Sequence, residues 1–313
     1  MSTPQNPHTR QEIVGFTYAM GAYLWWGLVP LYFSAIAHIS VWEILAHRML
    51  WSFPILVLIV LLRKHWSQIR SALASRRVVA LLLLSTVCIA TNWLLYIWAV
   101  AHHRVTEASL GYYLNPLINI ALGMIVLRER MRSLQWLALL LAGAGVVWYT
   151  ISLDELPWIA ITLAVTFGLY ALIRKVIHIN AFDGLFIEIA LLLVPSIVFL
   201  IVVESSSGTA MLAGNPRDTM LLLVAGIVTV TPLLWFTEGA RRLRLSTMGF
   251  MQYIAPSIQL LLAIFAFREP FTTPHAIAFG CIWASLSIYT VDAVVTLRRK
   301  RRLRLSMEVV EDL

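Results

Sequence analysis

The sequence predicts an all-α polytopic membrane protein in which ten transmembrane helices form two inverted five-helix repeats. Three observations predict this fold class. Of the 313 residues, 60% are hydrophobic and 13% are charged, which leaves too few polar residues to cover a soluble domain of this length. Apolar stretches of membrane-spanning length recur from end to end. In addition, the two halves of the chain resemble each other at a constant offset.

The predicted spans follow one another through short connections. The connections 63–77 and 204–218 are the longest, and the second contains Ser205–Gly208 and Asn215-Pro216, which favour turns. Neither connection is long enough for a soluble domain, so membrane spans fill the chain. In chain order, the predicted spans are 14–36, 41–62, 78–101, 105–127, 134–151, 157–174, 184–203, 219–240, 245–267 and 275–297.

The distribution of Lys and Arg predicts the orientation of these spans. Of the 24 basic residues, 20 fall at the two termini and on every second connection, three fall on the other connections, and Arg48 lies inside a span. Basic residues collect on the cytoplasmic side of membrane proteins. We therefore expect a multi-pass membrane protein with both termini in the cytoplasm, and the resemblance given below implies a bacterial inner membrane. The polar amino terminus lacks the pattern of a cleaved signal peptide.

An internal repeat accounts for the order of the spans. Segment 91–150 aligns with segment 231–290 without a gap, and 13 of the 60 positions are identical. The identical pairs include Tyr113 with Tyr253, Pro116 with Pro256, and Arg128-Glu129 with Arg268-Glu269. Five helices per repeat make the second copy enter the membrane the opposite way, as in many secondary transporters. The predicted domains are repeats at 14–151 and 157–297, followed by a basic cytoplasmic tail at 298–313.

Polar residues inside apolar spans are rare, and they indicate candidate functional positions. Glu43, His47 and Arg48 lie in the second span, and the spacing of four places Glu43 and His47 on one helix face. One interpretation is a substrate or ion site, with a proton-linked histidine–carboxylate pair. The alternative is an internal Glu–Arg pair near the outer interface.

The fourth and ninth spans carry corresponding polar stripes. Tyr112, Asn115 and Asn119 share one face of the fourth span, which Pro116 interrupts. The repeat places Gln252 and Gln259 on the matching face of the ninth span, around Pro256. Two proline-kinked helices related by inversion would line opposite walls of one cavity, with the prolines as hinges. The alternative is hydrogen bonding that only holds the helices together.

Aromatic and amide side chains complete the predicted substrate site. Asn92 and Tyr96 share one face of the third span, and Trp235 and Tyr253 lie in the eighth and ninth spans. Aromatic rings at this depth can stack on a planar or amphipathic substrate, whereas the alternative is packing or lipid contact. The full predicted set is Glu43, His47, Arg48, Asn92, Tyr96, Tyr112, Asn115, Asn119, Trp235, Gln252, Tyr253 and Gln259.

Several kinds of protein are disfavoured by the sequence. Cys88 and Cys281 lie in apolar stretches, and the chain has neither zinc-ligand spacing nor a GxxxxGK[ST] phosphate loop. We predict no metal site and no cofactor. Cytoplasmic loops account for the net charge of +8, so we predict no nucleic-acid partner. No nucleophile is spaced to pair with His47, so we predict that the protein is not an enzyme.

Five segments resemble one family of known transporters. They are GAYLWWGLVPLYF (21–33), EILAHRMLWS (43–52), TNWLLYIWAVAHHRVTEASLGYYLNPLINIALG (91–123), TPLLWFTEGARRLRLSTMGFMQYIAPSIQLLLA (231–263) and FREP (267–270). The chain thereby resembles the RarD branch of the EamA-type proteins, within the drug/metabolite transporter superfamily. The resemblance covers nearly the whole chain up to the basic tail. It implies a ten-helix inner-membrane permease, usually regarded as an exporter, and the family's link with chloramphenicol sensitivity implies drug efflux.

We therefore predict a secondary transporter that exports small amphipathic metabolites or drugs by alternating access, through a cavity between the inverted repeats. Its predicted partners are the small-molecule substrate and membrane lipid, with protons as the candidate coupling ion, and a monomer is the expected state. One alternative is a facilitative uptake permease or exchanger for amino-acid-like metabolites. The other is an integral membrane protein that transports nothing.

Overall fold

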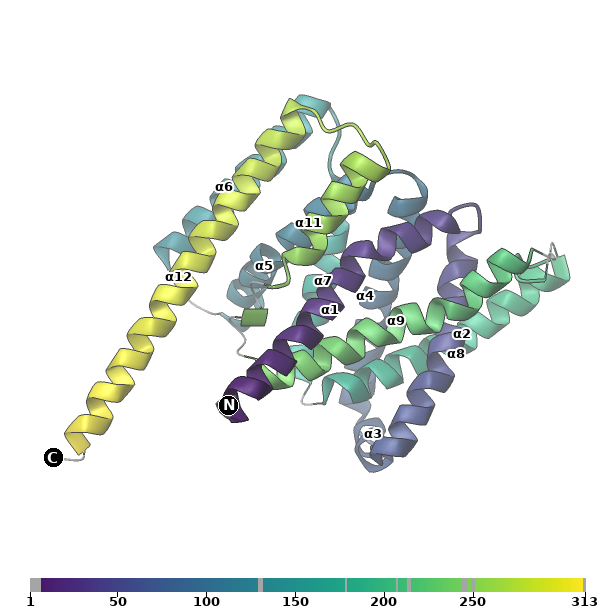
Figure 1. Ribbon diagram of the computed structural model, residues 1–313, viewed down its shortest axis with the longest axis horizontal. Coiled ribbons are helices and arrows are strands. Elements are labelled where there is room, and N and C mark those ends of the chain that lie inside the picture. Colours follow the sequence, from purple (N-terminus) through teal and green to yellow (C-terminus); the bar gives the residue numbers. More distant parts are fainter. Residues whose placement is uncertain are drawn as a thin grey trace, which may run out of the picture.

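The computed structural model describes residues 7–128, 132–177, 179–206, 208–212, 215–243, 247–248 and 251–311. Within these ranges every regular element is a helix, and the long helices lie side by side in a bundle (Figure 1). Helices α6 and α12 pack together at one side, and α12 continues beyond the bundle. The elements are α1 (Pro7–Ala35), α2 (Val41–Arg63), α3 (Trp66–Leu73), α4 (Arg76–Ala101), α5 (Val105–Leu127), α6 (Ser133–Leu153), α7 (Trp158–Val176), α8 (Ala181–Ser206), α9 (Pro216–Arg242), α11 (Ile254–Leu261), η1 (Leu262–Ala266) and α12 (Thr273–Glu311).

Eight of the described helices are long and apolar enough to cross a membrane, namely α2, α4 to α9, and α12. They correspond to the second to eighth and the tenth predicted spans. Helix α1 has 29 residues and covers the first predicted span, but it is not among these eight. The protein is therefore a polytopic α-helical membrane protein, while the count of ten spans and their inverted arrangement remain predictions.

The ninth predicted span, 245–267, differs most from expectation. Residues 244–246 and 249–250 of this region lie outside the described residues. The rest comprises helical residues at 247–248 and 251, a turn at 252–253, α11, of eight residues, and one π-helical turn, η1, of five residues. Pro256 is the third residue of α11, and because it has no N–H, the carbonyl of Gln252 cannot accept the usual helical hydrogen bond. The turn at 252–253 therefore lies where the proline removes a helical contact.

A short helix, α3, occupies the connection predicted at 63–77. It buries Ile69 and Ala72, whereas Trp66 and Leu73 are exposed. The ring of Trp66 contacts that of Phe186 on α8, with centres 6.4 Å apart. The spacing of Trp66, Ile69 and Leu73 is helical, and this signal was present in the sequence. An amphipathic helix of this kind lies along a membrane surface.

Local sequence explains several helix ends. The side chains of Ser75 and Asn215 each accept a backbone N–H from the first turn of the helix that follows, α4 and α9 respectively. At the carboxyl-terminal ends of two other helices, Lys64 after α2 and Arg128 after α5 adopt left-handed φ values of 56° and 53°. A left-handed residue closes a helix by turning the chain back on its last carbonyl groups.

The packing order brings together helices from both halves of the chain, α1 to α6 and α7 to α12. Helix α1 packs on α9 and α11, and α7 packs on α4 and α5. Helix α2 packs on both α8 and α9. As a result, the polar side chains of the second and third predicted spans face residues from the second half.

Candidate substrate site

The three polar side chains of α2 point to two different places. Glu43, His47 and Arg48 are only 5%, 3% and 8% exposed. Glu43 and His47 share a face, and His47 Nε2 lies 3.8 Å from Glu43 Oε1. Arg48 follows Glu43 by five positions, which turns its side chain about 140° around the helix. It therefore meets other helices, and no Glu43–Arg48 pair forms.

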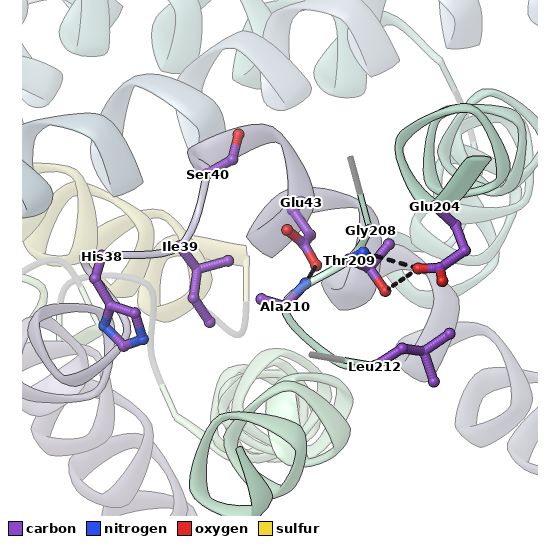
Figure 2. A pocket seen from close by; sticks show the side chains of 9 residues that line it. All are labelled: His38, Ile39, Ser40, Glu43, Glu204, Gly208, Thr209, Ala210 and Leu212. Carbon is purple, nitrogen blue, oxygen red and sulfur yellow. Dashed lines mark hydrogen bonds between the residues drawn. The ribbon is translucent and has the colours of Figure 1, made fainter. Parts of the chain in front are cut away.

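Glu43 borders a pocket of about 410 Å³ at the end of the bundle where α2, α5, α7 and α9 begin, which we name the first end. Figure 2 shows Glu43 and Glu204 on either side of the connection between α8 and α9. Glu43 Oε1 accepts the N–H of Ala210 at 2.7 Å. Glu204 Oε2 accepts both the N–H and the hydroxyl of Thr209, each at 2.7 Å. Glu43 thus holds this connection against α2, and Glu204 holds it against the end of α8.

Arg48 lies inside the bundle against two aromatic rings. Its Nε donates a hydrogen bond to Thr229 Oγ1 on α9, at 3.0 Å. The guanidinium carbon lies 5.2 Å from the ring centre of Phe33 on α1 and 5.1 Å from that of Trp93 on α4. Desolvated cation–π contacts of this kind contribute about 2 kcal/mol each.

Three tyrosines complete the surroundings of the guanidinium. Tyr32, Tyr96 and Tyr112 are its electrostatic partners, and within the described residues no carboxylate lies within ion-pair distance of Arg48. The rings of Tyr96 and Tyr112 lie 5.5 Å apart, and the buried Tyr96 Oη has no hydrogen-bond partner among the described residues. An unpaired buried ion costs several kcal/mol, so this arrangement requires explanation. We name the group the Arg48 box: Arg48, Thr229, Phe33, Trp93, Tyr32, Tyr96 and Tyr112.

The predicted stripe on α5 leads away from the Arg48 box. Tyr112 belongs to the box, and Asn115, one turn further on, is 8% exposed. Asn115 Oδ1 is buried without a hydrogen-bond partner among the described residues. Asn119 is exposed, and its Oδ1 lies beside Gly168 of α7. The stripe is therefore polar along its length, but only its first two members are enclosed.

The corresponding residues near α11 are spread over a similar length. Gln252 precedes the helix and is exposed. Tyr253 stacks on Tyr113 of α5, with ring centres 6.3 Å apart. Gln259 Nε2 donates to the backbone oxygen of Trp26 at 3.1 Å, while its buried Oε1 has no partner in the described part of the chain. Gln259 therefore ties α11 to α1 and still presents one unused acceptor.

The remaining two predicted residues make structural contacts. Asn92 Nδ2 donates to the backbone oxygen of Leu163 at 2.9 Å and to Thr166 Oγ1 at 3.0 Å, which joins α4 to α7. Trp235 packs edge-on against Trp25 of α1, with ring centres 5.7 Å apart. Neither residue touches the guanidinium, although Asn92 immediately precedes Trp93 of the Arg48 box.

Sequence reasoning missed several residues that the structure makes prominent. Phe33, Trp93 and Thr229 surround Arg48, yet apolar and hydroxyl side chains give no signal within an apolar span. Two carboxylates at the first end were also missed. Glu269 accepts the N–H groups of Val105 and Thr106 at the start of α5, both at 2.7 Å. Such caps satisfy the free N–H groups of a helix start and complement its dipole.

Glu107, which lies on α5, caps the start of another helix, α7, in the same way. Its Oε1 accepts the N–H of Ile159 at the start of α7, at 2.8 Å, and its Oε2 lies 2.8 Å from Arg104 Nη2. Glu107 is 3% exposed and Glu269 is 7% exposed. Glu43, Glu107 and Glu269 thus join different helices at the first end, and all three do so through backbone N–H groups.

A second polar cluster lies towards the opposite end of the bundle, which we name the second end. Glu188 of α8 is fully buried. It accepts hydrogen bonds from Ser85 of α4 at 2.6 Å and Tyr170 of α7 at 3.4 Å, and Arg174 lies 3.8 Å away. Glu188 therefore links three helices by side-chain contacts.

The ion pairs at the second end differ in burial, because Arg174–Glu188 is buried whereas Arg63–Glu238 lies nearer the surface. Arg63 pairs with Glu238 at 3.3 Å, and their side chains are 38% and 19% exposed. Within the described residues, no group of three or more His, Cys, Asp or Glu side chains could hold a metal ion. The buried polar side chains offer contacts for a small molecule. The two ends of the bundle are held together by different sets of polar contacts.

Eight candidate membrane spans around buried polar side chains define a polytopic membrane protein with an internal polar site. A model of the EamA-like transporter family matches residues 13–151. The chain is 44% identical over 291 residues to Protein RarD of Escherichia coli K12, which covers 93% of this chain and 98% of that protein. It is 41% identical over 298 residues to an uncharacterized transporter of Vibrio cholerae, covering 95% and 99%. The chain belongs to the EamA-like transporter family and is a RarD-type member of it.

Two further comparisons extend this result. The chain is 38% identical over 291 residues to Protein RarD of Streptomyces exfoliatus, covering 93% of this chain and 92% of that protein. A solved crystal structure superposes with a TM-score of 0.57 and 18% sequence identity, covering 92% of this chain and 99% of that chain. At this identity the likeness concerns the fold alone.

Proposed function

We propose that the protein is a secondary transporter that exports small amphipathic molecules by alternating access, with the Arg48 box as part of its substrate site. One observation carries the proposal: Arg48 of the first half donates to Thr229 of the second half inside the bundle. A charged residue between the two halves of a membrane protein is typical of a substrate pathway. The transporter names of the family and of several relatives support this class.

Two helix crossings support the inverted repeat. A Cβ added to Gly27 of α1 would lie 2.8 Å from the side chain of Ile258 on α11. A Cβ added to Gly168 of α7 would lie 2.7 Å from the side chain of Ile118 on α5. Ile118 and Ile258 are equivalent in the repeat, and Gly27 and Gly168 correspond to within one position of the same alignment. The same glycine-to-isoleucine contact thus occurs twice, with the two halves of the chain exchanged.

The backbone supports the same relationship. Arg128 and Arg268, which are equivalent positions of the repeat, adopt nearly equal left-handed φ values of 53° and 54°. Both residues follow a helical segment that carries the polar stripe of its half. The packing of α1 on α9 and α11 likewise corresponds to the packing of α7 on α4 and α5.

The two ends of the bundle supply the gates of the proposed cycle. At the first end, Glu43 holds the connection before α9, while Glu107 and Glu269 cap the starts of α7 and α5, all through backbone N–H groups. At the second end, the Arg63–Glu238 pair is partly exposed. In the proposed cycle, opening of the second end breaks this surface pair and the buried contacts of Glu188, and the present conformation is the one closed at the first end. Release of the three carboxylate contacts would expose the site to the other side.

The orientation follows from the charges. The connections at the second end carry most of the Lys and Arg residues, as the cytoplasmic loops of bacterial membrane proteins do. The chain ends lie there too (Figure 1). We place the second end in the cytoplasm, so the closed first end faces the periplasm and the site is approached from inside, as export requires.

A solute screen followed by reconstitution tests the proposal. Untargeted metabolomics of cells and medium, with and without the gene, should show one or more small molecules depleted from the medium when the gene is absent. The purified full chain in proteoliposomes should then move the best such molecule faster than protein-free liposomes. Folded, reconstituted protein that moves none of the screened molecules would contradict transport.

A further inference from the structure

The Arg48 box contains a charge that the rest of the protein leaves unbalanced. The guanidinium group has five N–H donors. Its Nε–H is used by Thr229, and the other four have no acceptor among the described residues. Within those residues, its electrostatic partners are three neutral tyrosines. The side chain is nevertheless held in place by Thr229 on one side and the rings of Phe33 and Trp93.

From this arrangement we infer that the Arg48 box binds the oxyanion head of an organic anion, whose apolar or aromatic body lies against the surrounding rings. This inference gives the chemical class of the substrate of the proposed transporter. It rests on the proposed transport function only in that the bound anion is called a substrate.

The geometry of the donors favours an oxyanion. The Nη1 and Nη2 groups form a planar fork that matches two oxygens of a carboxylate, sulfonate or phosphate. The hydrogen bond from Nε to Thr229 fixes the plane of this fork, so its free edge is defined before a ligand arrives. The unused hydroxyl of Tyr96 adds one more donor near the same charge.

The walls of the box favour an apolar body. Phe33, Trp93, Tyr96 and Tyr112 come from three helices, and successive rings are in contact: Phe33 with Tyr96 at 6.1 Å and Tyr96 with Tyr112 at 5.5 Å between centres. An inorganic ion bound to the guanidinium would make no apolar contact with these rings. A ligand with both parts would place the oxyanion on Arg48 and its body along the line of rings towards Asn115.

Binding to the purified full chain in nanodiscs tests the inference with two matched pairs of probes. The anions are toluene-4-sulfonate and 4-methylbenzoate, and the neutral partners are toluene-4-sulfonamide and 4-methylbenzamide. Equilibrium dialysis with displacement by excess unlabelled probe should give at least tenfold tighter binding of one or both anions. If neither anion binds more tightly than its amide, the inference is wrong.

Substitutions then assign the preference to the box. Arg48→Gln should reduce the ratio of anion to amide affinity to near one, Arg48→Lys should keep part of it, and Thr229→Val should reduce it several-fold. Arg217→Gln, which removes an exposed arginine at the start of α9, should leave the ratio unchanged. Retention of tenfold anion preference by folded Arg48→Gln protein would overturn the inference.

A melting curve separates ligand binding from a structural role. If the guanidinium is an empty anion site, Arg48→Gln removes an uncompensated charge. The melting temperature of the ligand-free variant should then lie within a few degrees of that of the wild type. A fall of more than ten degrees in both Arg48 variants, with normal anion preference in Thr229→Val, would show a structural arginine and overturn the inference. Flux decides the proposed function separately: anion binding without flux contradicts transport, whereas flux that Arg48→Gln leaves intact contradicts only the anion site.

Discussion

Tyr113 and Tyr253 stack on each other with ring centres 6.3 Å apart and 17° between their planes, although they come from different halves of the chain and are equivalent positions of the repeat. In an inverted repeat, a residue can contact its own equivalent only if both lie close to the axis that relates the two copies. This stack therefore marks the proposed axis. Its polar contacts are not symmetric, because the Tyr113 hydroxyl is 2.6 Å from Ser257 Oγ, while the position equivalent to Ser257 is Leu117.

The repeated glycine–isoleucine crossing gives a pairwise prediction. Gly27→Ala and Gly168→Ala should each destabilise the protein by about 1–3 kcal/mol, because a Cβ at either position overlaps an isoleucine. In double-mutant cycles followed by thermal unfolding in detergent, Ile258→Ala should reduce the cost of Gly27→Ala, and Ile118→Ala should reduce the cost of Gly168→Ala, because alanine lacks the contacting Ile258 Cδ1 and Ile118 Cγ2 atoms. Gly143→Ala is the control, since a Cβ there has no neighbour within 4 Å.

The prediction is specific to each glycine–isoleucine pair. Combining Gly27→Ala with Ile118→Ala should leave the cost of Gly27→Ala unchanged, because these residues belong to different crossings. Equal restoration by both isoleucine variants would contradict two separate contacts and would weaken the proposed inverted arrangement.

Asn92 and Asn115 should respond differently to the same substitution. Asn92→Leu removes two hydrogen bonds to α7 and should destabilise the fold by about 1–3 kcal/mol. Asn115→Leu removes an unpartnered oxygen and should leave Tm unchanged or higher. Proteoliposome flux should fall in Asn115→Leu despite normal stability, because its oxygen lies beside the proposed path. Wild-type flux in that variant would remove Asn115 from the substrate site.

Glu107 should matter far more for stability than its neighbour Glu155. Glu107→Ala leaves the N–H of Ile159 and the charge of Arg104 without their buried partner, and should destabilise the protein by about 1–3 kcal/mol. Glu155 is half exposed and pairs only with Arg104, so Glu155→Ala should change stability by about 0–1 kcal/mol. Thermal unfolding of both variants checks the order, and equal effects would contradict a capping role for Glu107.

Glu43 is the residue we propose for coupling to protons, because it joins the first-end contact to His47. Glu43→Gln keeps an oxygen that can accept the N–H of Ala210 but removes the titrating group. Flux driven by a pH gradient should be lost in this variant, while exchange between equal substrate concentrations persists. Glu204→Gln, on the other side of the same pocket, is the control and should keep its gradient dependence. Gradient-driven flux in Glu43→Gln would exclude Glu43 as the coupling residue.

The sequence was informative where composition and periodicity act over many residues. Long apolar stretches predicted the helical membrane class, and the RarD-type relatives confirm the family resemblance. The ninth segment shows the limit of this reasoning. Hydropathy from 245 to 267 predicted a continuous span, whereas in the described residues a turn at 252–253 precedes α11 and the helix ends in a π-turn. Hydropathy does not register backbone hydrogen bonds, such as the one that Pro256 cannot donate.

Individual site residues were harder to predict than the fold. Arg48 and Tyr96 could be named because polar atoms are rare in apolar spans, and both lie in the Arg48 box. Trp93 could not be distinguished from the other tryptophans, since its role depends on which helix faces α4. Asn92 has the same polar signal as Asn115, yet its amide is used by α7.

The length of helix α12 has a practical use in structure determination. Its predicted span ends at residue 297, and the helix continues to Glu311, which carries it roughly 20 Å beyond that span. A small folded protein joined in helical register to this extension would be rigidly oriented and clear of the detergent belt or lipid disc. Such a fusion would give a particle of this size an asymmetric landmark for alignment in electron cryomicroscopy.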